Sequence, residues 1–166
     1  MKEILKKEAE KKNSLQPQPK TIVSCRGKDG RDNALVVGYC GNCSFDPPML
    51  MIGIVPSRFS YHMVKETGCM VVNLPTKEFK KEFDYLGSTS GKDEDKFKKM
   101  NIKSKDADTV DAPLLVDCPV NIELKVVDSI MTGSHEMFAC TVEKVHCAEQ
   151  YLKEDGTIDF SKLDLI

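Results

Sequence analysis

Segment 87–92 combines the groups that bind a phosphate. Its glycines expose backbone N–H donors, Ser88 and Ser90 bring hydroxyls, and Lys92 brings a positive charge. The segment differs from a Walker loop, because its glycines are one residue too close and Asp93 stands where a magnesium-binding Ser or Thr is required. A helix C-cap followed by a linker is the alternative role. Both roles stay open on the residues alone.

Cys40 and Cys43 form a single CxxC pair. A structural zinc site needs a second pair or histidines at matching spacing, which the sequence lacks, so we expect no metal site. A redox dithiol belongs at a helix N-terminus, whereas a proline-terminated loop follows this pair. Inert loop cysteines are therefore favoured. The total of seven cysteines is odd and fits no secreted disulfide framework, so we expect reduced thiols in a reducing compartment.

Histidines offer few acid and base groups, since the chain has only His62, His135 and His146. His135 is the best placed, because it follows Gly133 at the start of a predicted strand and can project over a barrel mouth. A solvent-facing turn residue is the alternative. No serine lies in a nucleophile-elbow motif, so the sequence offers no nucleophile for a catalytic triad.

The composition indicates one compact domain that binds a small partner. The chain has 166 residues, with 24 Lys and Arg against 26 Asp and Glu, and a pI near 6.0. Near-neutral charge argues against a nucleic-acid or membrane binder that works by electrostatics. The sequence has no long uncharged apolar run and no signal-peptide pattern, so we expect a cytoplasmic protein with no membrane association.

The N-terminal segment differs in composition from the rest of the chain. The first twelve residues carry five Lys and three Glu, which predicts a short charged helix. Pro17 and Pro19 cannot continue a helix. We therefore expect residues 1–18 to form a helix and linker and residues 19–166 to form the folded domain.

The sequence of the domain predicts mainly β-strands. We expect a hairpin from 21–25 and 33–38, a polar loop without regular structure at 39–48, and a buried strand at 49–55. Further strands are expected at 69–74, 120–126 and 136–143, the last two as a long hairpin, and segment 103–111 as an irregular surface excursion.

Two or three short helices interrupt these strands. One runs to Thr67 with Ser57 or Ser60 as its cap and Gly68 as its stop, one follows Thr76 and closes at Gly87, and one spans 93–100. Mostly antiparallel strands with few short helices predict a β-barrel rather than a doubly wound α/β sheet.

The order of these segments resembles the flavin reductase-like family, in particular its flavoredoxin-like subgroup. The resemblance rests on a collinear set over roughly 19–165: Asp46-Pro47-Pro48, Asn73-Leu74-Pro75, segment 87–97 and Gly133-Ser134-His135. It implies a mainly β fold, the FMN-binding split β-barrel, which is a Greek-key antiparallel barrel with a few short inserted helices.

The resemblance also implies an FMN site. The residues that it places around the flavin ring and ribityl chain are Tyr39, Cys40, Gly41, Asn42, Cys43 and Ser44. Those that it places near the phosphate are Ser57, Arg58 and Ser60, together with Ser88, Ser90 and Lys92. His135 matches the Gly-x-His position of the family and would orient the incoming donor or supply a proton.

The implied activity is electron transfer from NADH or NADPH through FMN to a flavin or protein acceptor, in a homodimer. A flavoredoxin-like carrier with tightly bound FMN, a redox-protein partner and no direct NAD(P)H activity is the alternative. A ligand-binding barrel whose cysteine pair takes a metal is a third reading.

Overall fold

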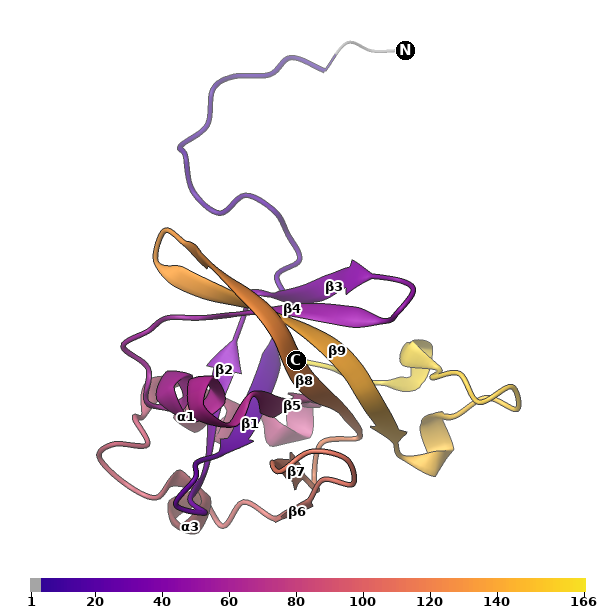
Figure 1. Cartoon of the computed structure of the whole chain (residues 1–166). Helices are drawn as coiled ribbons and strands as arrows, with labels where there is room; N and C mark the ends of the chain where they lie inside the picture. The colour runs from indigo at the N-terminus through magenta and orange to yellow at the C-terminus, as the bar shows by residue number, and fades with distance from the viewer. Residues whose placement is uncertain (1–3) are drawn as a thin grey trace.

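The computed structural model describes residues 4–166, of which the first part forms no regular structure (Figure 1). Residues 4–20 run as exposed, non-helical chain up to the first strand, so the predicted N-terminal helix is wrong for residues 4–12; the rest of it, residues 1–3, lies outside the described residues. Ile4 and Leu5 stay exposed and pack on nothing that would stabilise a short helix. The boundary near residue 18 stays a prediction.

Seven antiparallel strands form the main sheet, in the order β2-β1-β5-β8-β9-β4-β3 (Figure 1). These strands are β1 (Thr21–Arg26), β2 (Asp32–Val37), β3 (Cys40–Ser44), β4 (Met49–Ile54), β5 (Cys69–Leu74), β8 (Val120–Thr132) and β9 (His135–Cys147). The predicted β1–β2 and β8–β9 hairpins are confirmed. The sheet coils until β2 contacts β4 without joining its ladder, which gives a split barrel.

Segment 39–48 corrects the sequence prediction of a loop. Residues 40–44 form the edge strand β3, which pairs with β4 through Gly41 opposite Met51 and is irregular between Asn42 and Ser44. A glycine-bearing polar strand lacks the alternation by which strands are recognised, and pairing with β4 stabilises it instead.

Short helices occupy the connections. They are α1 (Phe59–Thr67), the 3-10 turn η1 (Lys77–Phe79), α2 (Lys80–Ser88), α3 (Lys96–Met100) and the 3-10 turns η2 (Glu149–Tyr151) and η3 (Phe160–Lys162). Arg58 occupies the N-cap of α1 without a side-chain hydrogen bond, so the expected Ser57 or Ser60 cap is wrong. Gly68 ends α1 in the left-handed region, at φ 68°, as predicted. No helix within residues 4–166 is long and apolar enough to span a membrane.

Two apolar clusters flank β1. Val23, Ile52 and Phe138 are among the residues that fill the barrel. On the opposite face of β1, Ile22 packs with Leu86 of α2. Because neighbouring residues of a strand face opposite sides, β1 ties the barrel to α2 and to the loop that follows it.

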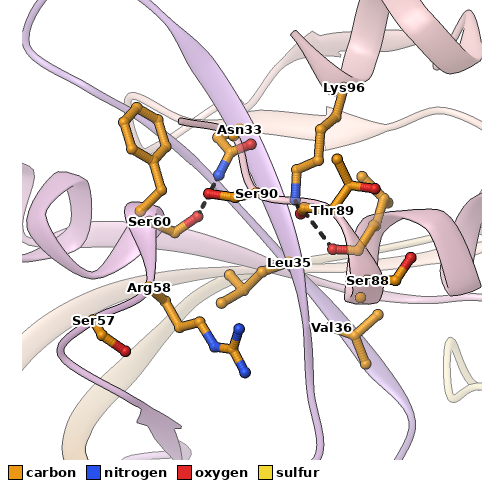
Figure 2. A pocket seen from close by; sticks show the side chains of 14 residues that line it. Asn33, Leu35, Val36, Ser57, Arg58, Ser60, Ser88, Thr89, Ser90 and Lys96 are labelled. Carbon is orange, nitrogen blue, oxygen red and sulfur yellow. Dashed lines mark hydrogen bonds between the residues drawn. The ribbon is translucent and has the colours of Figure 1, made fainter. Parts of the chain in front are cut away.

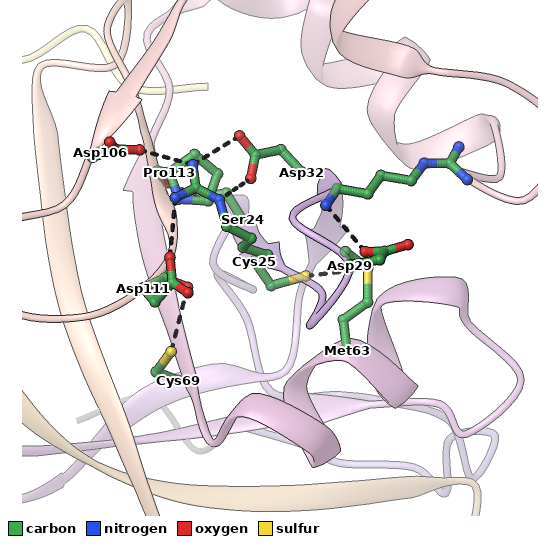
Figure 3. Close-up of polar contacts among 11 residues, drawn as sticks. Ser24, Cys25, Asp29, Asp32, Met63, Cys69, Asp106, Asp111 and Pro113 are labelled. Carbon is green, nitrogen blue, oxygen red and sulfur yellow. Dashed lines mark hydrogen bonds and ion pairs between the residues drawn. The ribbon is translucent and has the colours of Figure 1, made fainter.

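The excursion after α3 is more regular than the sequence predicts, because β6 (Ser104–Asp106) pairs with β7 (Pro113–Leu115). Arg26, the last residue of β1, holds it in place. Figure 3 shows Asp32, Asp106 and Asp111, the three carboxylates that this side chain pairs with. The Arg26 guanidinium contacts Asp32 at 2.7 Å, Asp106 at 2.8 Å and Asp111 at 3.0 Å. One cation therefore joins the β1–β2 hairpin to both sides of the turn between β6 and β7.

Candidate functional site

A pocket of about 280 Å³ lies beside the free edge of β2 (Figure 2). Its lining comes from β2, the start of α1, the end of α2, the loop after it, and α3. The lining residues are Asn33, Leu35, Val36, Ser57, Arg58, Phe59, Ser60, Leu86, Gly87, Ser88, Thr89, Ser90, Gly91 and Lys96. The structure thus brings together five of the six residues expected near a phosphate: Ser57, Arg58, Ser60, Ser88 and Ser90.

Two glycines let the end of α2 and the loop after it approach β2. A Cβ atom on Gly91 would lie 2.5 Å from Asn33 Oδ1, and one on Gly87 would lie 3.1 Å from a methyl carbon of Val36. Arg31 braces the same loop by donating to the Gly91 carbonyl oxygen. A Cβ atom on Gly91 would force the Asn33 side chain to move, and one on Gly87 would require Val36 to shift slightly, so both glycines favour this close approach to β2.

The pocket is cationic. Within the described chain, Arg58 and Lys96 line it and no lining residue carries a carboxylate. Arg58 reaches in from the α1 side and Lys96 from the α3 side (Figure 2). Two positive charges without a lining anion suit a ligand that brings its own negative charge.

Lys96 is unusual for a lysine because its side chain is buried, with 3% exposure. Its ammonium donates hydrogen bonds to the carbonyl oxygens of Leu86 at 3.1 Å and Thr89 at 3.0 Å, which belong to the C-terminal end of α2. Burial lowers the pKa of Lys96 to about 8, and repulsion from Arg58 adds to this effect. An anion bound between the two cations would offset both effects.

The serine hydroxyls of the pocket differ in the hydrogen bonds that they make. Ser60 is buried and accepts a hydrogen bond from the Asn33 side chain at 2.7 Å. Ser88 donates back to the Asp84 carbonyl oxygen at 2.8 Å, whereas Ser90 accepts the backbone N–H of Lys92 at 3.2 Å. Lys92 itself is exposed and does not line the pocket. Lys96, which was not among the residues predicted from the sequence, lines the pocket in which Lys92 was expected.

A second pocket, of about 500 Å³, lies at the start of β3. Tyr39, Cys40, Gly41 and Asn42 line it, together with side chains of β4 and β9 and with chain before β1. Cys43 and Ser44 line neither pocket. Four of the residues expected around a flavin ring therefore line one pocket, and five of those expected around its phosphate line another. Val36 of the first pocket and Gly38 of the second are two residues apart in the chain.

His135 lines neither pocket but contacts the second one through Tyr39. The two rings lie 4.5 Å apart between centroids, tilted by 59°. Ser134 Oγ lies 2.8 Å from His135 Nδ1. The ring of His135 is therefore held at the tip of the β8–β9 hairpin, beside the start of β3.

The cysteine pair does not form a compact dithiol. Cys40 packs against the barrel core, which raises its pKa by burial, whereas Cys43 is exposed. Three residues of extended strand span roughly 10 Å, beyond the Cα separation of a disulfide. Asp108, Glu123 and His146 lie close enough for an ion, but Thr109 and His146 bond to Glu123 and Lys144 pairs with Asp108. This network is satisfied internally.

The residues present fit the phosphate end of FMN. Two cations, hydroxyls and a strand edge offer charge and hydrogen bonds at one end, and the second pocket offers the apolar side chains of Met51 and Met137 at the other. Such a site suits an elongated ligand with an anionic end and an apolar end.

Comparison with known proteins supports the resemblance to the flavin reductase-like family. The model of the flavin reductase like domain matches residues 14–161 and so begins within the predicted linker. The structure resembles the flavoredoxin of Desulfovibrio vulgaris (Miyazaki F), with a TM-score of 0.89, 28% identity and coverage of 95% of this chain and 85% of that one. It also resembles the flavoredoxin of Methanosarcina acetivorans, with a TM-score of 0.86, 26% identity and coverage of 96% and 85%.

A sequence relative is an uncharacterized protein of Archaeoglobus fulgidus, 29% identical over 131 residues, which are 79% of this chain and 73% of that protein. The family model spans most of the chain, and the split barrel agrees with it. The chain therefore belongs to the flavin reductase-like family and, within it, is flavoredoxin-like.

Proposed function

We propose that the protein binds FMN and transfers electrons from NADH or NADPH through it to a flavin or protein acceptor. The family places the chain in the class of flavin-binding oxidoreductases. The observation that carries the choice of FMN is the cationic pocket, in which Arg58 and Lys96 face a volume without a lining carboxylate. A phosphate monoester has the charge and the acceptor oxygens that this pocket lacks.

The chain's own residues bind and orient. Arg58 and Lys96 neutralise the phosphate, with Ser57, Ser60, Ser88 and Ser90 around it. The free edge of β2 and the exposed edge of β3 present unpaired backbone N–H groups for the ribityl chain and ring. FMN, when bound, supplies the capacity to accept a hydride or single electrons and to pass them on.

His135 acts on the donor side of the ring in this proposal. Its imidazole lies against Tyr39, at the edge of the second pocket, where it orients a nicotinamide or supplies a proton. Ser134 holds the ring from Nδ1. This leaves Nε2 as the atom that faces a bound donor.

A homodimer and a cytoplasmic location complete the proposal. Phe45, Val127, Ile130 and Met131 are large apolar side chains that stay exposed in the single chain, and a second copy would cover them. Seven free thiols suit a reducing compartment. The mass in solution, measured by light scattering, tests the dimer: a monomeric mass contradicts it.

The second candidate function is an electron carrier without direct NAD(P)H activity. The likeness to two flavoredoxins favours it. Carrier and reductase share the FMN site and differ in whether a reduced nicotinamide nucleotide reaches the ring.

One experiment tests both candidates. The purified protein is titrated with FMN, and the flavin absorbance is then followed anaerobically after one equivalent of NADH or NADPH. Bleaching within seconds supports the reductase and identifies the donor. A bound flavin that stays oxidised until dithionite is added supports the carrier, and absence of FMN binding contradicts both.

A further inference from the structure

The chain before β1 contacts the second pocket directly. We name residues 12–19 the N-terminal strap; it passes beside β3 and β4 on its way to β1 (Figure 1). The Asn13 side-chain amide donates to the Tyr39 hydroxyl. At the other end, Gln18 lies so close to Gly38 that a Cβ on that glycine would be 2.7 Å from Gln18 Nε2. The strap therefore contacts the turn between β2 and β3 at two points.

Between these contacts the strap and the sheet leave a space. The pocket of about 500 Å³ has Leu15, Pro17 and Pro19 on the strap side and Met51 and Met137 on the sheet side. Its walls are mostly apolar, and no side chain of the described residues fills it. Such a space suits a flat ring system, and prolines limit the entropy that the strap loses when it closes on one.

The second pocket lies a short distance from the first. Val36 lines the first pocket and Gly38 the second, and two residues of extended chain span roughly 7 Å. One elongated ligand can thus place an anionic end between Arg58 and Lys96 and its ring beneath the strap.

We propose that the N-terminal strap closes over the ring end of bound FMN and slows its release, so that the flavin is held as a prosthetic group. This inference rests on the proposed FMN site. The family assignment and the phosphate pocket do not require it, because the phosphate contacts come from other segments of the chain.

Variants of the full chain test the strap through the FMN dissociation rate, measured by adding an excess of a flavin-trapping apoprotein. Asn13→Ala removes the bond to Tyr39, and Leu15→Ala removes an apolar wall. Each variant should raise the dissociation rate roughly two- to tenfold. Lys11→Ala, one residue before the strap and outside the pocket lining, is the matched control and should leave the rate unchanged. Equal rates in all four proteins would overturn the proposal.

Limited trypsin digestion gives a readout independent of the variants. The bond after Lys12 lies in the strap, whereas Lys28 in the exposed β1–β2 turn reports general cleavage. Saturating FMN should abolish early cleavage after Lys12 and leave cleavage after Lys28 unchanged. If FMN binds, as its quenched fluorescence shows, and Lys12 is cut at the same rate with and without it, the strap proposal fails while the FMN site stands. If no FMN binds, the proposed function itself fails.

Discussion

Lys96 should stabilise bound FMN while destabilising the protein without it. Burial holds its pKa at about 8 against an ordinary 10.5, a difference that corresponds to roughly 3 kcal/mol of unfavourable free energy for the charged form in the fold. The penalty acts below pH 8 and disappears as the pH rises from about 8 to 10.5, where the unfolded chain still holds the proton and the folded chain does not.

Lys96→Met removes the charge and keeps most of the volume. It also leaves the Leu86 and Thr89 carbonyl oxygens without their donor, which costs about 1–3 kcal/mol and offsets the gain. At pH 7 we expect the unfolding free energy of the FMN-free protein to be unchanged or about 2 kcal/mol higher. FMN affinity should fall roughly 10- to 100-fold, because a charge-assisted hydrogen bond to the phosphate is lost.

Denaturant titration of the FMN-free protein and FMN fluorescence quenching measure the two quantities. In the unaltered protein, FMN affinity should also weaken as the pH rises above about 8, since the free pocket then loses the Lys96 proton, and in Lys96→Met this pH dependence should be absent. A variant that loses more than about 2 kcal/mol of stability and binds FMN normally would refute the reasoning. Lys96 would then serve only to cap the C-terminal end of α2.

Three other predictions concern single side chains. Arg58→Ala should weaken FMN binding by about 1.5–3 kcal/mol and leave riboflavin binding unchanged in fluorescence titrations; equal loss for both ligands would remove Arg58 from the phosphate site. His135→Ala should keep FMN affinity within about twofold and slow single-turnover reduction by NADH or NADPH at least roughly tenfold, and an unaltered rate would exclude His135 from the reaction. Arg26→Met should lower the unfolding free energy by about 2 kcal/mol in denaturant titrations without affecting FMN binding, because three carboxylates lose their partner; unchanged stability would mean that these ion pairs contribute nothing.

The residue pattern correctly predicted those strands whose own residues favour strand formation. β5 is an apolar run interrupted by Asn73 alone between Gly68 and Pro75, and the sequence of β8 begins with strict alternation, so both were predictable. β3 was missed because its residues are polar or glycine, and its pairing with β4 is a tertiary contact. The predicted N-terminal helix fails for the opposite reason, since good local propensity has no apolar surface to pack against.

The candidate site shows the same limit. Segment 87–92 was identified because glycine, serine and lysine together are typical of phosphate-binding segments. The structure places Ser88 and Ser90 in the pocket. Lys92 and Lys96 belong to one charged run, and only the packing of α3 decides which of them is buried. Asn33 gave one usable signal, a polar residue directly before the apolar run 34–37, which indicates a side chain held by a partner.

The most direct test of the central claim compares two ligands that differ only in the phosphate. FMN and riboflavin present the same ring to the second pocket, so the cationic pocket alone distinguishes them. If Arg58 and Lys96 each contribute about 1.5–3 kcal/mol, FMN should bind roughly 10²- to 10⁴-fold more tightly than riboflavin at pH 7. Equal dissociation constants for the two flavins would contradict the assignment of this pocket to the phosphate.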